Sequence, residues 1–304
     1  MSVTAEVGTT KFIDVEKVIA GKNPALIRFL PGFVISYLKR IIHQDEVNAF
    51  LERSRDKQGL EFVDEAVQTF SPNITLRGTE NLQASQRFVV ASNHPLGGLD
   101  GIVLMHAIGK MRTDIQFLVN DILMYLSNLQ PLFVPINKHG SNADNIRILD
   151  DTFRGDAVIC YFPFGLVSRK SKGVIRDLDW KKTFLTKAKK FERDIVPTHI
   201  NGRNSSFFYN LSNLRKALGI KANLEMLYLS DEFFKQKNQD ITITFGRPIP
   251  FKVFDKRYSD QQWAEKMRRF VYYLAENPEI EFDPAKEYIL NTHKKGNKTH
   301  GTGK

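Results

Sequence analysis

A histidine and an aspartate in the first half of the chain are residue types that can move a proton near neutral pH. His94 and Asp100 lie in the stretch Asn-His-Pro-Leu-Gly-Gly-Leu-Asp-Gly, directly after the apolar run 88–91. An imidazole suits general-base catalysis because it titrates at about pH 6.5, and an adjacent carboxylate orients it and stabilises its protonated form. We therefore predict His94 as a general base and Asp100 as its supporting carboxylate.

The glycines between these two residues decide whether they can meet. Five residues separate His94 from Asp100, so contact requires a turn, which Gly97 and Gly98 permit. Backbone N–H groups at such a turn, where a helix begins, would also suit a negatively charged oxygen. The alternative for Asp100 is a helix N-cap without a chemical role. The substrate contacts predicted in this stretch are Asn93, Gly97 and Gly98.

Short apolar runs alternate with helical patterns along most of the chain. The predicted strands are 74–77, 87–92, 115–119, 132–136, 157–162, 195–200 and 241–245. The predicted helices are 102–111, 144–153, 180–193, 207–218 and 260–275. This alternation is typical of an α/β fold with a largely parallel sheet flanked by helices. His94 then follows a buried strand at its carboxyl end, where open α/β sheets place ligands.

Three parts of the chain are expected: a helical segment 1–70, an α/β domain 71–290 and a disordered basic tail 291–304. Within the first part, the segment 25–42 is apolar and aromatic but is interrupted by charges and Pro31. It is too interrupted to span a bilayer, and its basic flanks suit a helix pair that associates with the membrane interface. An amphipathic cap on the domain core is the equal alternative. The residues predicted to insert are Ile27, Phe29, Leu30, Phe33, Val34 and Leu38, helped by Arg28, Lys39 and Arg40.

Composition limits the partners and the compartment. The chain of 304 residues carries a formal net charge of +10, which favours nucleic acid, anionic lipid or an acidic protein. The basic residues are scattered and form no nucleic-acid-binding motif, so nucleic acid is not expected. The single cysteine, Cys160, suits a reducing compartment. No signal peptide, spanning helix or metal-ligand spacing is recognised.

Three further stretches combine apolar runs with cations or turn residues. The first, 133–138, ends in Lys138. The second, 161–173, contains Gly165 and Arg169. The third, 195–209, contains Arg203 and Asn204, for which turn-forming roles are the alternative. The predicted substrate-binding residues from these stretches are Lys138, Gly165, Arg169, Arg203 and Asn204.

The four stretches, in this order, resemble the lysophosphatidic acid acyltransferase-like superfamily of glycerolipid acyltransferases over roughly residues 70–250. The resemblance implies that His94 is the general base and that Asp100 supports it. The chain departs from the family pattern at three places. The His–Asp spacing is one residue longer, Lys138 replaces an Arg, and Phe164 replaces a Glu. A Lys lacks the bidentate fork with which Arg holds a phosphate.

The departures resemble one branch, the hemolysin-like bacterial amino-acid N-acyltransferases of ornithine and glycine lipid synthesis. The residues that carry this likeness are 93–101 and 202–209. The resemblance implies transfer of a 3-hydroxy fatty acyl group from acyl carrier protein to the amine of glycine or ornithine. No cofactor is implied beyond the co-substrate, acyl-acyl carrier protein or acyl-CoA. The implied place is cytoplasmic, peripheral on the inner face of the cell membrane.

The alternative is O-acylation of a lysophospholipid or of glycerol phosphate, as in the wider superfamily. Lys138 and Phe164 argue against a glycerol phosphate acceptor, and lysophosphatidic acid is expected to be a poor acceptor. An inactive family member that serves as a membrane scaffold is a further alternative, against which the intact His94 and Asp100 argue. The expected partners are acyl carrier protein, an anionic membrane surface, and an amino-acid or lysolipid acceptor.

Overall fold

The computed structural model describes residues 12–22, 24–136 and 142–290. Lys138 and the predicted tail 291–304 lie outside the described residues. The descriptions below refer to these three ranges.

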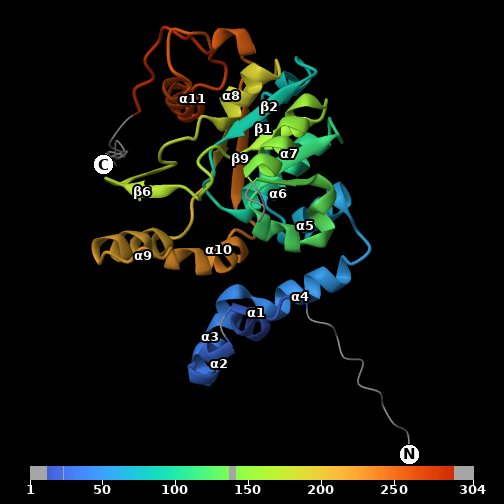
Figure 1. The fold of residues 1–304 in the computed structure, drawn as a ribbon, viewed down its shortest axis with the longest axis vertical. Helices are drawn as coiled ribbons and strands as arrows, with labels where there is room; N and C mark the ends of the chain where they lie inside the picture. Colours follow the sequence, from blue (N-terminus) through green and yellow to red (C-terminus); the bar gives the residue numbers. More distant parts are fainter. Residues whose placement is uncertain (1–11, 23, 137–141, 291–304) are drawn as a thin grey trace, which may run out of the picture.

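A seven-stranded sheet forms the centre of the described part of the chain (Figure 1). Its strand order is β1-β9-β8-β2-β5-β3-β4, and all neighbouring strands are parallel except β8 and β9. This confirms the predicted α/β fold with a largely parallel sheet, and each predicted strand is present. The strands are β1 (Asn73–Arg77), β2 (Phe88–Ser92), β3 (Ile115–Val119), β4 (Phe133–Pro135), β5 (Val158–Tyr161), β8 (Asp194–Asn201) and β9 (Asp240–Phe245).

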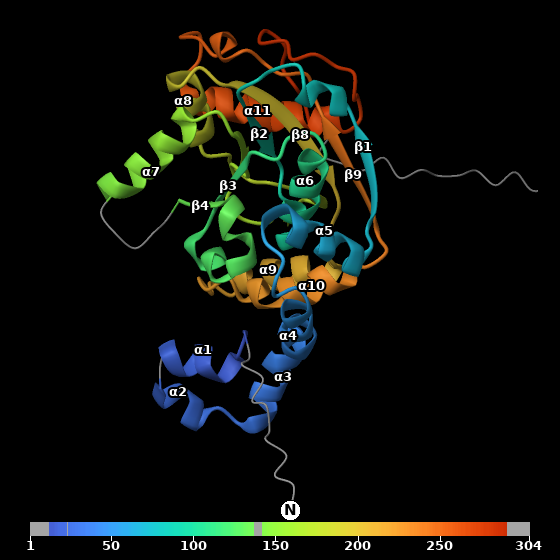
Figure 2. The same cartoon turned by 90° about the vertical axis from the view of Figure 1, so that its right-hand side faces the viewer.

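Strand β2 is buried on both of its faces, as a continuous apolar run predicts. Phe88 and Val90 pack into one hydrophobic cluster, while Val89 and Ala91 pack into a second on the opposite face. Helices α5 (Gly59–Phe70) and α6 (Gly98–Gly109) contribute to the first cluster. Helices α7 (Asn142–Arg154), α8 (Thr183–Lys190) and α11 (Asp260–Leu274) contribute to the second (Figure 2). The strand that leads to His94 therefore runs between two helical layers.

The other helices of the described ranges are short 3-10 helices and six further α-helices. The short 3-10 helices are η1 (Thr79–Leu82), η2 (Asp121–Tyr125), η3 (Ser127–Leu132), η4 (Leu224–Tyr228) and η5 (Phe251–Val253). The other α-helices are α1 (Val15–Lys22), α2 (Pro24–Phe29), α3 (Gly32–Ile42), α4 (Gln44–Arg53), α9 (Ser206–Ala217) and α10 (Leu229–Lys235).

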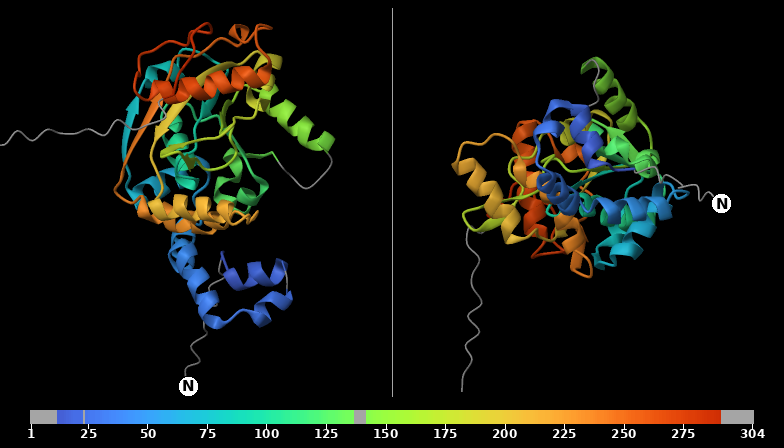
Figure 3. Two further views of the ribbon diagram at one scale, coloured as in Figure 1. Left: turned by 90° about the vertical axis from the view of Figure 1, so that its left-hand side faces the viewer. Right: turned by 90° about the horizontal axis from the view of Figure 1, so that it is seen from below.

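The first three helices project away from the sheet, on the side where α9 and α10 lie (Figures 2 and 3). Phe29 is 82% exposed and Phe33 is 75% exposed. Helix α3 contacts α10 and η4, where the hydroxyls of Tyr37 and Tyr228 lie 2.7 Å apart. None of the helices in the described ranges is both long and apolar enough to cross a membrane.

Two local elements were not predicted. A hairpin of β6 (Arg169–Ser171) and β7 (Val174–Arg176) forms a second, two-stranded sheet. Its sequence is mostly basic and polar, so it lacks the apolar alternation by which a strand is recognised. Helix α10 has seven residues, which is too short for a helical period to be evident. Both elements lie beside the predicted site.

Candidate active site

His94 and Asp100 form a direct pair at the carboxyl end of β2. His94 Nδ1 lies 2.9 Å from Asp100 Oδ2. The Asp100 side chain is fully buried, while 17% of the His94 side chain is exposed. Because a carboxylate accepts, Nδ1 carries the proton and Nε2 is left as the basic nitrogen. The predicted pairing is thus present in a form suited to general-base chemistry.

The turn at Gly97 makes this pairing possible. Gly97 has φ +87°, a left-handed conformation that glycine adopts without strain. A Cβ at this position would also lie 3.3 Å from the Leu229 side chain. Helix α6 begins at Gly98, so Asp100 lies in its first turn. The longer spacing between the two residues is therefore accommodated by a turn that only glycine fits.

Asp100 accepts backbone hydrogen bonds in addition to the one from the imidazole. The N–H groups of Leu96 and Gly97 donate to Oδ2 at 2.7 and 3.0 Å. Burial raises the pKa of the Asp100 carboxyl, and the hydrogen bonds from His94 and the backbone oppose that rise. Gly97 is the N-cap of α6 and Asp100 is its third residue, so the N-cap interpretation of Asp100 is wrong. Asp100 holds the turn at the helix start through these backbone hydrogen bonds and also contacts the His94 imidazole.

The imidazole is fixed on its flat side by an aromatic ring. His94 stacks on Phe162 with ring centroids 4.0 Å apart and an interplanar angle of 16°. Phe162 directly follows β5 and contacts Phe117 on β3. The His94 ring is therefore positioned by Phe162, which is supported by β3 and β5, and by Asp100 on α6.

Asn93 connects two strands through its side-chain amide. Its Nδ2 donates to the Ile200 carbonyl at 2.9 Å, and its Oδ1 accepts from the Ile200 N–H at 2.7 Å. The structure therefore places Asn93 as a link between the end of β2 and strand β8. A direct contact of this side chain with substrate stays a prediction.

Arg169 is buried at the start of the β6–β7 hairpin, with an exposed fraction of 3%. One guanidinium nitrogen, Nη2, lies 3.0 Å from Glu225, which also pairs with Arg215. The other terminal nitrogen, Nη1, is buried without a hydrogen-bond partner. Two guanidinium groups share one carboxylate, so this cluster has a surplus of one positive charge.

Asn204 is also 3% exposed, and both polar atoms of its side chain lack a hydrogen-bond partner. Its backbone N–H donates to the Tyr209 hydroxyl at 3.1 Å. Burial raises the pKa of Tyr209 to about 12, and the charges of Asp100 and Arg169 also act on it. The structure therefore brings Arg169 and Asn204 to the same neighbourhood, around Tyr209 and close to Asp100.

The other predicted substrate contacts are placed differently. Gly98 opens α6 and faces Phe233, and Gly165 adopts φ +70° in an exposed turn. Arg203 is exposed, and its backbone carbonyl accepts from Gln236 Nε2 at 3.2 Å. Lys138 lies outside the described residues. The substrate roles of these four residues stay predictions.

Two other titratable residues are buried near the site and are not equipped for catalysis. Cys160 lies within β5, and burial raises the pKa of its thiol, which disfavours the thiolate that a nucleophile requires. Burial lowers the pKa of His199 to about 4, so this imidazole is neutral near pH 7. Among the described residues, no group of three or more His, Cys, Asp or Glu side chains is arranged to hold a metal.

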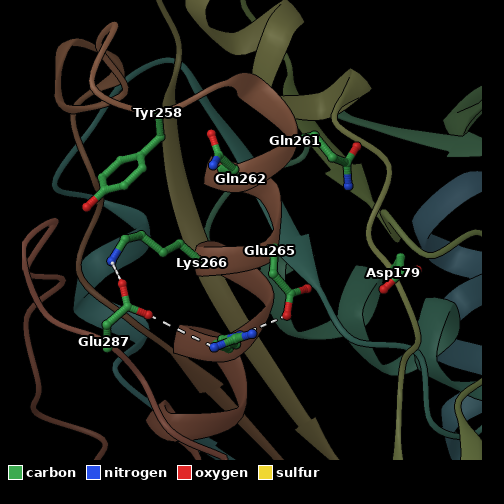
Figure 4. Close-up of a pocket in the computed structure, with 8 residues that line it drawn as sticks. Asp179, Tyr258, Gln261, Gln262, Glu265, Lys266 and Glu287 are labelled. Atoms are coloured by element: carbon green, nitrogen blue, oxygen red, sulfur yellow. Dashed lines mark hydrogen bonds and ion pairs between the residues drawn. The ribbon is translucent and has the colours of Figure 1, made fainter.

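A hollow lies along α11, lined by residues of that helix together with Asp179 and Tyr258 before it and Glu287 after it (Figure 4). Its charged side chains satisfy one another: Lys266 pairs with Glu287, and Arg269 pairs with Glu265 and Glu287. None of the predicted site residues lines it. We therefore assign no chemistry to this hollow.

Sequence reasoning missed Tyr209, Glu225 and Asp177, which surround the site from α9, η4 and the end of β7. Tyr209 lay within one of the selected stretches but had no chemical signal. Glu225 and Asp177 lie outside the acyltransferase-like motifs, and only the tertiary structure brings them to the site. Asp177 accepts the His94 backbone N–H at 3.3 Å.

Known proteins resemble this chain over most of its length. The family model described as acyltransferase matches residues 17–280. The lyso-glycine lipid O-acyltransferase of Bacteroides thetaiotaomicron is 47% identical over 264 residues, which cover 86% of this chain and 97% of the relative. The lyso-glycine lipid O-acyltransferase of Phocaeicola vulgatus is 46% identical, with 86% and 95% covered.

A solved structure is also similar. It is the 1-acyl-sn-glycerophosphate acyltransferase PlsC from Thermotoga maritima, with a TM-score of 0.46 and 16% sequence identity. The alignment covers 88% of this chain and 94% of that chain.

The two relatives correct the expected reaction. The sequence predicts N-acylation of a small amino acid with acyl carrier protein as donor, whereas both relatives are named O-acyltransferases of a lyso-glycine lipid. The N-acylation interpretation is therefore wrong. The error has a physical reason, because a His–Asp pair can remove a proton from a hydroxyl as well as from an ammonium group.

The expectation of an acyltransferase is confirmed. The family match spans the His94 loop, the β6–β7 hairpin and the Asn204 turn, so it includes every described residue of the site. This chain belongs to the acyltransferase family.

Proposed function

We propose that this protein is an O-acyltransferase that transfers a fatty acyl group to the hydroxyl of a lyso-glycine lipid. The observation that carries the proposal is the 47% identity to a lyso-glycine lipid O-acyltransferase across 97% of that relative. The His94–Asp100 pair supplies the base that this reaction needs. A glycine that carries a 3-hydroxy fatty acyl chain on its amine keeps one free hydroxyl, and that hydroxyl is the proposed acceptor.

In the proposed reaction, His94 Nε2 removes the proton from the acceptor hydroxyl as its oxygen attacks the acyl thioester. Asp100 stabilises the imidazolium that forms, because its carboxylate lies 2.9 Å from Nδ1. The tetrahedral intermediate collapses, the C–S bond breaks, and the imidazolium returns the proton to the thiolate. The products are an ester and the free thiol of the carrier.

The oxyanion of that intermediate requires hydrogen-bond donors. The N–H groups of Leu96 and Gly97 are already used by Asp100. The N–H groups of the first turn of α6, at Gly98 and Leu99, have no acceptor within the helix by helix geometry. We assign the oxyanion to these two, where the positive end of the helix dipole also favours negative charge.

The carboxylate of the glycine headgroup is proposed to bind Arg169 and Asn204. Arg169 Nη1 and both polar atoms of Asn204 are buried without a partner. Burying such groups costs free energy unless a ligand or water satisfies them. One carboxylate would accept from both residues and would compensate the surplus positive charge around Glu225.

The acyl donor is proposed to be an acyl thioester on acyl carrier protein or on coenzyme A, with no further cofactor. Lys170 and Lys172 on the β6–β7 hairpin leave positive charge beside the site. Both donors are acidic, so the net charge of +10 would favour their approach.

The projecting helices α1 to α3 are proposed to lie on an anionic membrane surface, at the inner face of the cell membrane. Phe29 and Phe33 are largely exposed, and Arg28 and Arg40 are exposed beside them. Large exposed apolar side chains flanked by cations are typical of an interfacial helix. Both the acceptor and the product of the proposed reaction are lipids, which such a contact would make accessible.

The test is an acceptor comparison with purified protein. Acyl carrier protein and coenzyme A thioesters are offered with N-(3-hydroxyacyl)glycine, free glycine or lysophosphatidic acid, and the products are identified by mass spectrometry. The proposal predicts a diacylated glycine lipid from the first acceptor and little product from the other two.

The matched control is an N-acylglycine of the same chain length that lacks the 3-hydroxyl. It has the same headgroup and apolar chain but no oxygen to acylate, so it should give no product. Acylation of free glycine in preference to the hydroxylated lipid, or formation of phosphatidic acid as the main product, would refute the proposed acceptor.

A further inference from the structure

A second buried carboxylate lies against the backbone of His94. Asp177, directly after β7, is fully buried. Its Oδ1 accepts the His94 N–H at 3.3 Å and the Ser168 hydroxyl at 2.6 Å. Its Oδ2 accepts from Trp180 Nε1 at 2.9 Å. Three donors thus converge on the two oxygens, an arrangement that suits an ionised carboxylate.

The His94 residue is held from both sides of its backbone by this arrangement. Its N–H donates to Asp177, while its carbonyl accepts from the Ser168 N–H at 2.7 Å. Ser168 donates its hydroxyl to the same Asp177 oxygen. The backbone of His94, Ser168 of the stretch 161–173 and the buried Asp177 carboxylate therefore form one closed set of hydrogen bonds.

Asp177 is itself fixed by α11. Its backbone N–H donates to the Tyr272 hydroxyl at 2.6 Å, and its carbonyl accepts from Arg268 Nη1 at 3.1 Å. Arg268 is in turn held by Glu265 on the same helix. Through Asp177, the His94 loop is therefore fixed to α11, which lies on the opposite face of the sheet from α6.

We propose that Asp177 is a positioning residue for the acyl transfer: its carboxylate holds the His94 backbone in place, and its negative charge stabilises the protonated base. The inference rests on the proposed function, in which His94 is the base. It deepens that function, because Asp100 hydrogen-bonds the imidazole ring while Asp177 holds the backbone that carries the ring.

No nearby positive charge cancels the effect of the Asp177 charge on His94 among the described groups considered next. Burial raises the pKa of Asp177, and hydrogen bonds from Ser168 and Trp180 and the charge of His94 oppose the rise. Arg268 is paired with Glu265 at 2.6 Å, so its charge is largely offset. On the other packed elements, His199 on β8 is neutral because its pKa is lowered to about 4.

One more group that faces the pair lies on α11. Burial raises the pKa of Tyr272 on α11 well above its usual range, so this phenol is neutral too. The negative charges that act on the imidazolium are then those of Asp100 and Asp177. Removing one of them should weaken the base as well as displace it.

The experiment compares Asp177→Asn with Asp194→Asn in the full-length protein. Asp194 begins β8 at the other end of the sheet and likewise accepts one serine hydroxyl and one backbone N–H, from Ser85 and Phe251. Both substitutions remove a charge and keep the side-chain shape, so Asp194→Asn controls for the structural cost. Activity is measured with both thioester donors as kcat, KM and a pH profile.

For Asp177→Asn we expect kcat to fall by about tenfold to a hundredfold, because small displacements of a catalytic group cost that much. The KM for the acceptor should stay within about twofold, since the acceptor contacts are untouched. The acidic limb of the kcat/KM profile should move to lower pH, because a base that loses a nearby negative charge is harder to protonate. Asp194→Asn should lower the melting temperature only.

If Asp177→Asn fails to fold, Ser168→Ala provides the same test. It removes the hydroxyl donated to Asp177 and keeps the Ser168 N–H that donates to His94, so kcat should fall by about threefold to tenfold. A wild-type kcat and pH profile in the folded variant would overturn the inference, as would an equal loss in Asp194→Asn.

A parallel His94→Ala measurement separates the two proposals. If His94→Ala remains active, the proposed mechanism fails and the role of Asp177 fails with it. If His94→Ala is inactive while Asp177→Asn behaves as wild type, the proposed function stands and only this inference is wrong.

Discussion

At the amino-terminal end of the central strands, Arg193 is fully buried and its guanidinium donates to the carbonyl oxygens of Phe153, Gly155 and Ala157. At the carboxyl-terminal end, Arg169 is almost as deeply buried, yet its Nη1 has no partner. The same type of side chain is thus used in two ways at opposite ends of the central sheet. A buried guanidinium whose three nitrogens are all hydrogen-bonded stabilises the fold, whereas one with a nitrogen left without a partner is suited to a ligand.

The carboxylates at the two ends differ in the same way. Asp194, at the amino-terminal end, has donors from Ser85 and Phe251, one on each oxygen. Asp100, at the other end, receives three hydrogen bonds on Oδ2, while its buried Oδ1 has no partner. The comparison teaches that unsatisfied buried polar atoms, more than buried charge itself, separate the reactive end of this sheet from the structural end.

The largest expected effect is on activity at the reactive end. His94→Ala should reduce turnover by at least about a hundredfold, because only the general base is removed. The fold should persist, since the backbone hydrogen bonds of His94 do not involve its side chain. Turnover with the lyso-glycine lipid and the thermal melt are measured together. Near-wild-type turnover with a cooperative melt would remove His94 from the mechanism.

At the amino-terminal end of the strands, replacing Arg193 should lower the stability of the fold and leave activity unchanged. Arg193→Met keeps much of the side-chain volume and removes the hydrogen bonds to the carbonyl oxygens of Phe153, Gly155 and Ala157, while Arg87 continues to donate to the first two. The free energy of unfolding should fall by about 3 kcal/mol or more, while kcat of the folded protein should not change. Urea unfolding and turnover of the same preparation test this. An unchanged unfolding midpoint would show that the buried guanidinium is not a structural anchor.

Arg169→Gln should act mainly on the acceptor. The substitution removes the positive charge proposed to meet the glycine carboxylate, so the KM for the acceptor should rise by about tenfold. Glu225 keeps its pairing with Arg215, so the fold should survive. The matched control is the methyl ester of the acceptor, which lacks the carboxylate. Its KM should therefore be similar for the wild type and for Arg169→Gln. Equal losses with acid and ester would assign Arg169 to structure.

Much of this fold could be predicted from the sequence because its signals are local. Most of the seven strands are short apolar runs, β1 and β9 alternate apolar with polar residues, and the continuous burial of β2 follows from four apolar residues in succession. The pairing of His94 with Asp100 could also be predicted, because contact requires a turn and the glycines between them permit one. The local sequence is therefore sufficient to predict the His94–Asp100 pair.

The rest of the site depends on partners that are distant along the chain. Asn93 hydrogen-bonds the backbone of Ile200, 107 positions away. A local sequence pattern cannot predict such a contact. Asp177 reaches the His94 backbone across 83 positions. The choice between an amine and a hydroxyl acceptor was not predictable either, because the base and its carboxylate serve both. That distinction came from the relatives.

The smallest expected effect concerns the projecting helices on the reactive side of the sheet, where α3 contacts α10 and the Phe233 side chain of α10 faces Gly98. Replacing Phe29 and Phe33 by serine should weaken binding to anionic vesicles by about 1 kcal/mol for each ring, roughly fivefold per residue. Vesicle flotation measures this, and binding should also weaken with salt because exposed cations contribute.

The matched control for these helices is Ile289→Ser, which removes an exposed apolar side chain in the segment after α11. Phe29 and Phe33 are both largely exposed, so their replacement should leave the melting temperature and the turnover of a detergent-dispersed acceptor unchanged. Only the turnover of acceptor embedded in vesicles should fall, because a protein that leaves the surface meets its lipid less often. If the double variant floats as well as the wild type, or if Ile289→Ser weakens flotation equally, the membrane contact does not lie on α2 and α3.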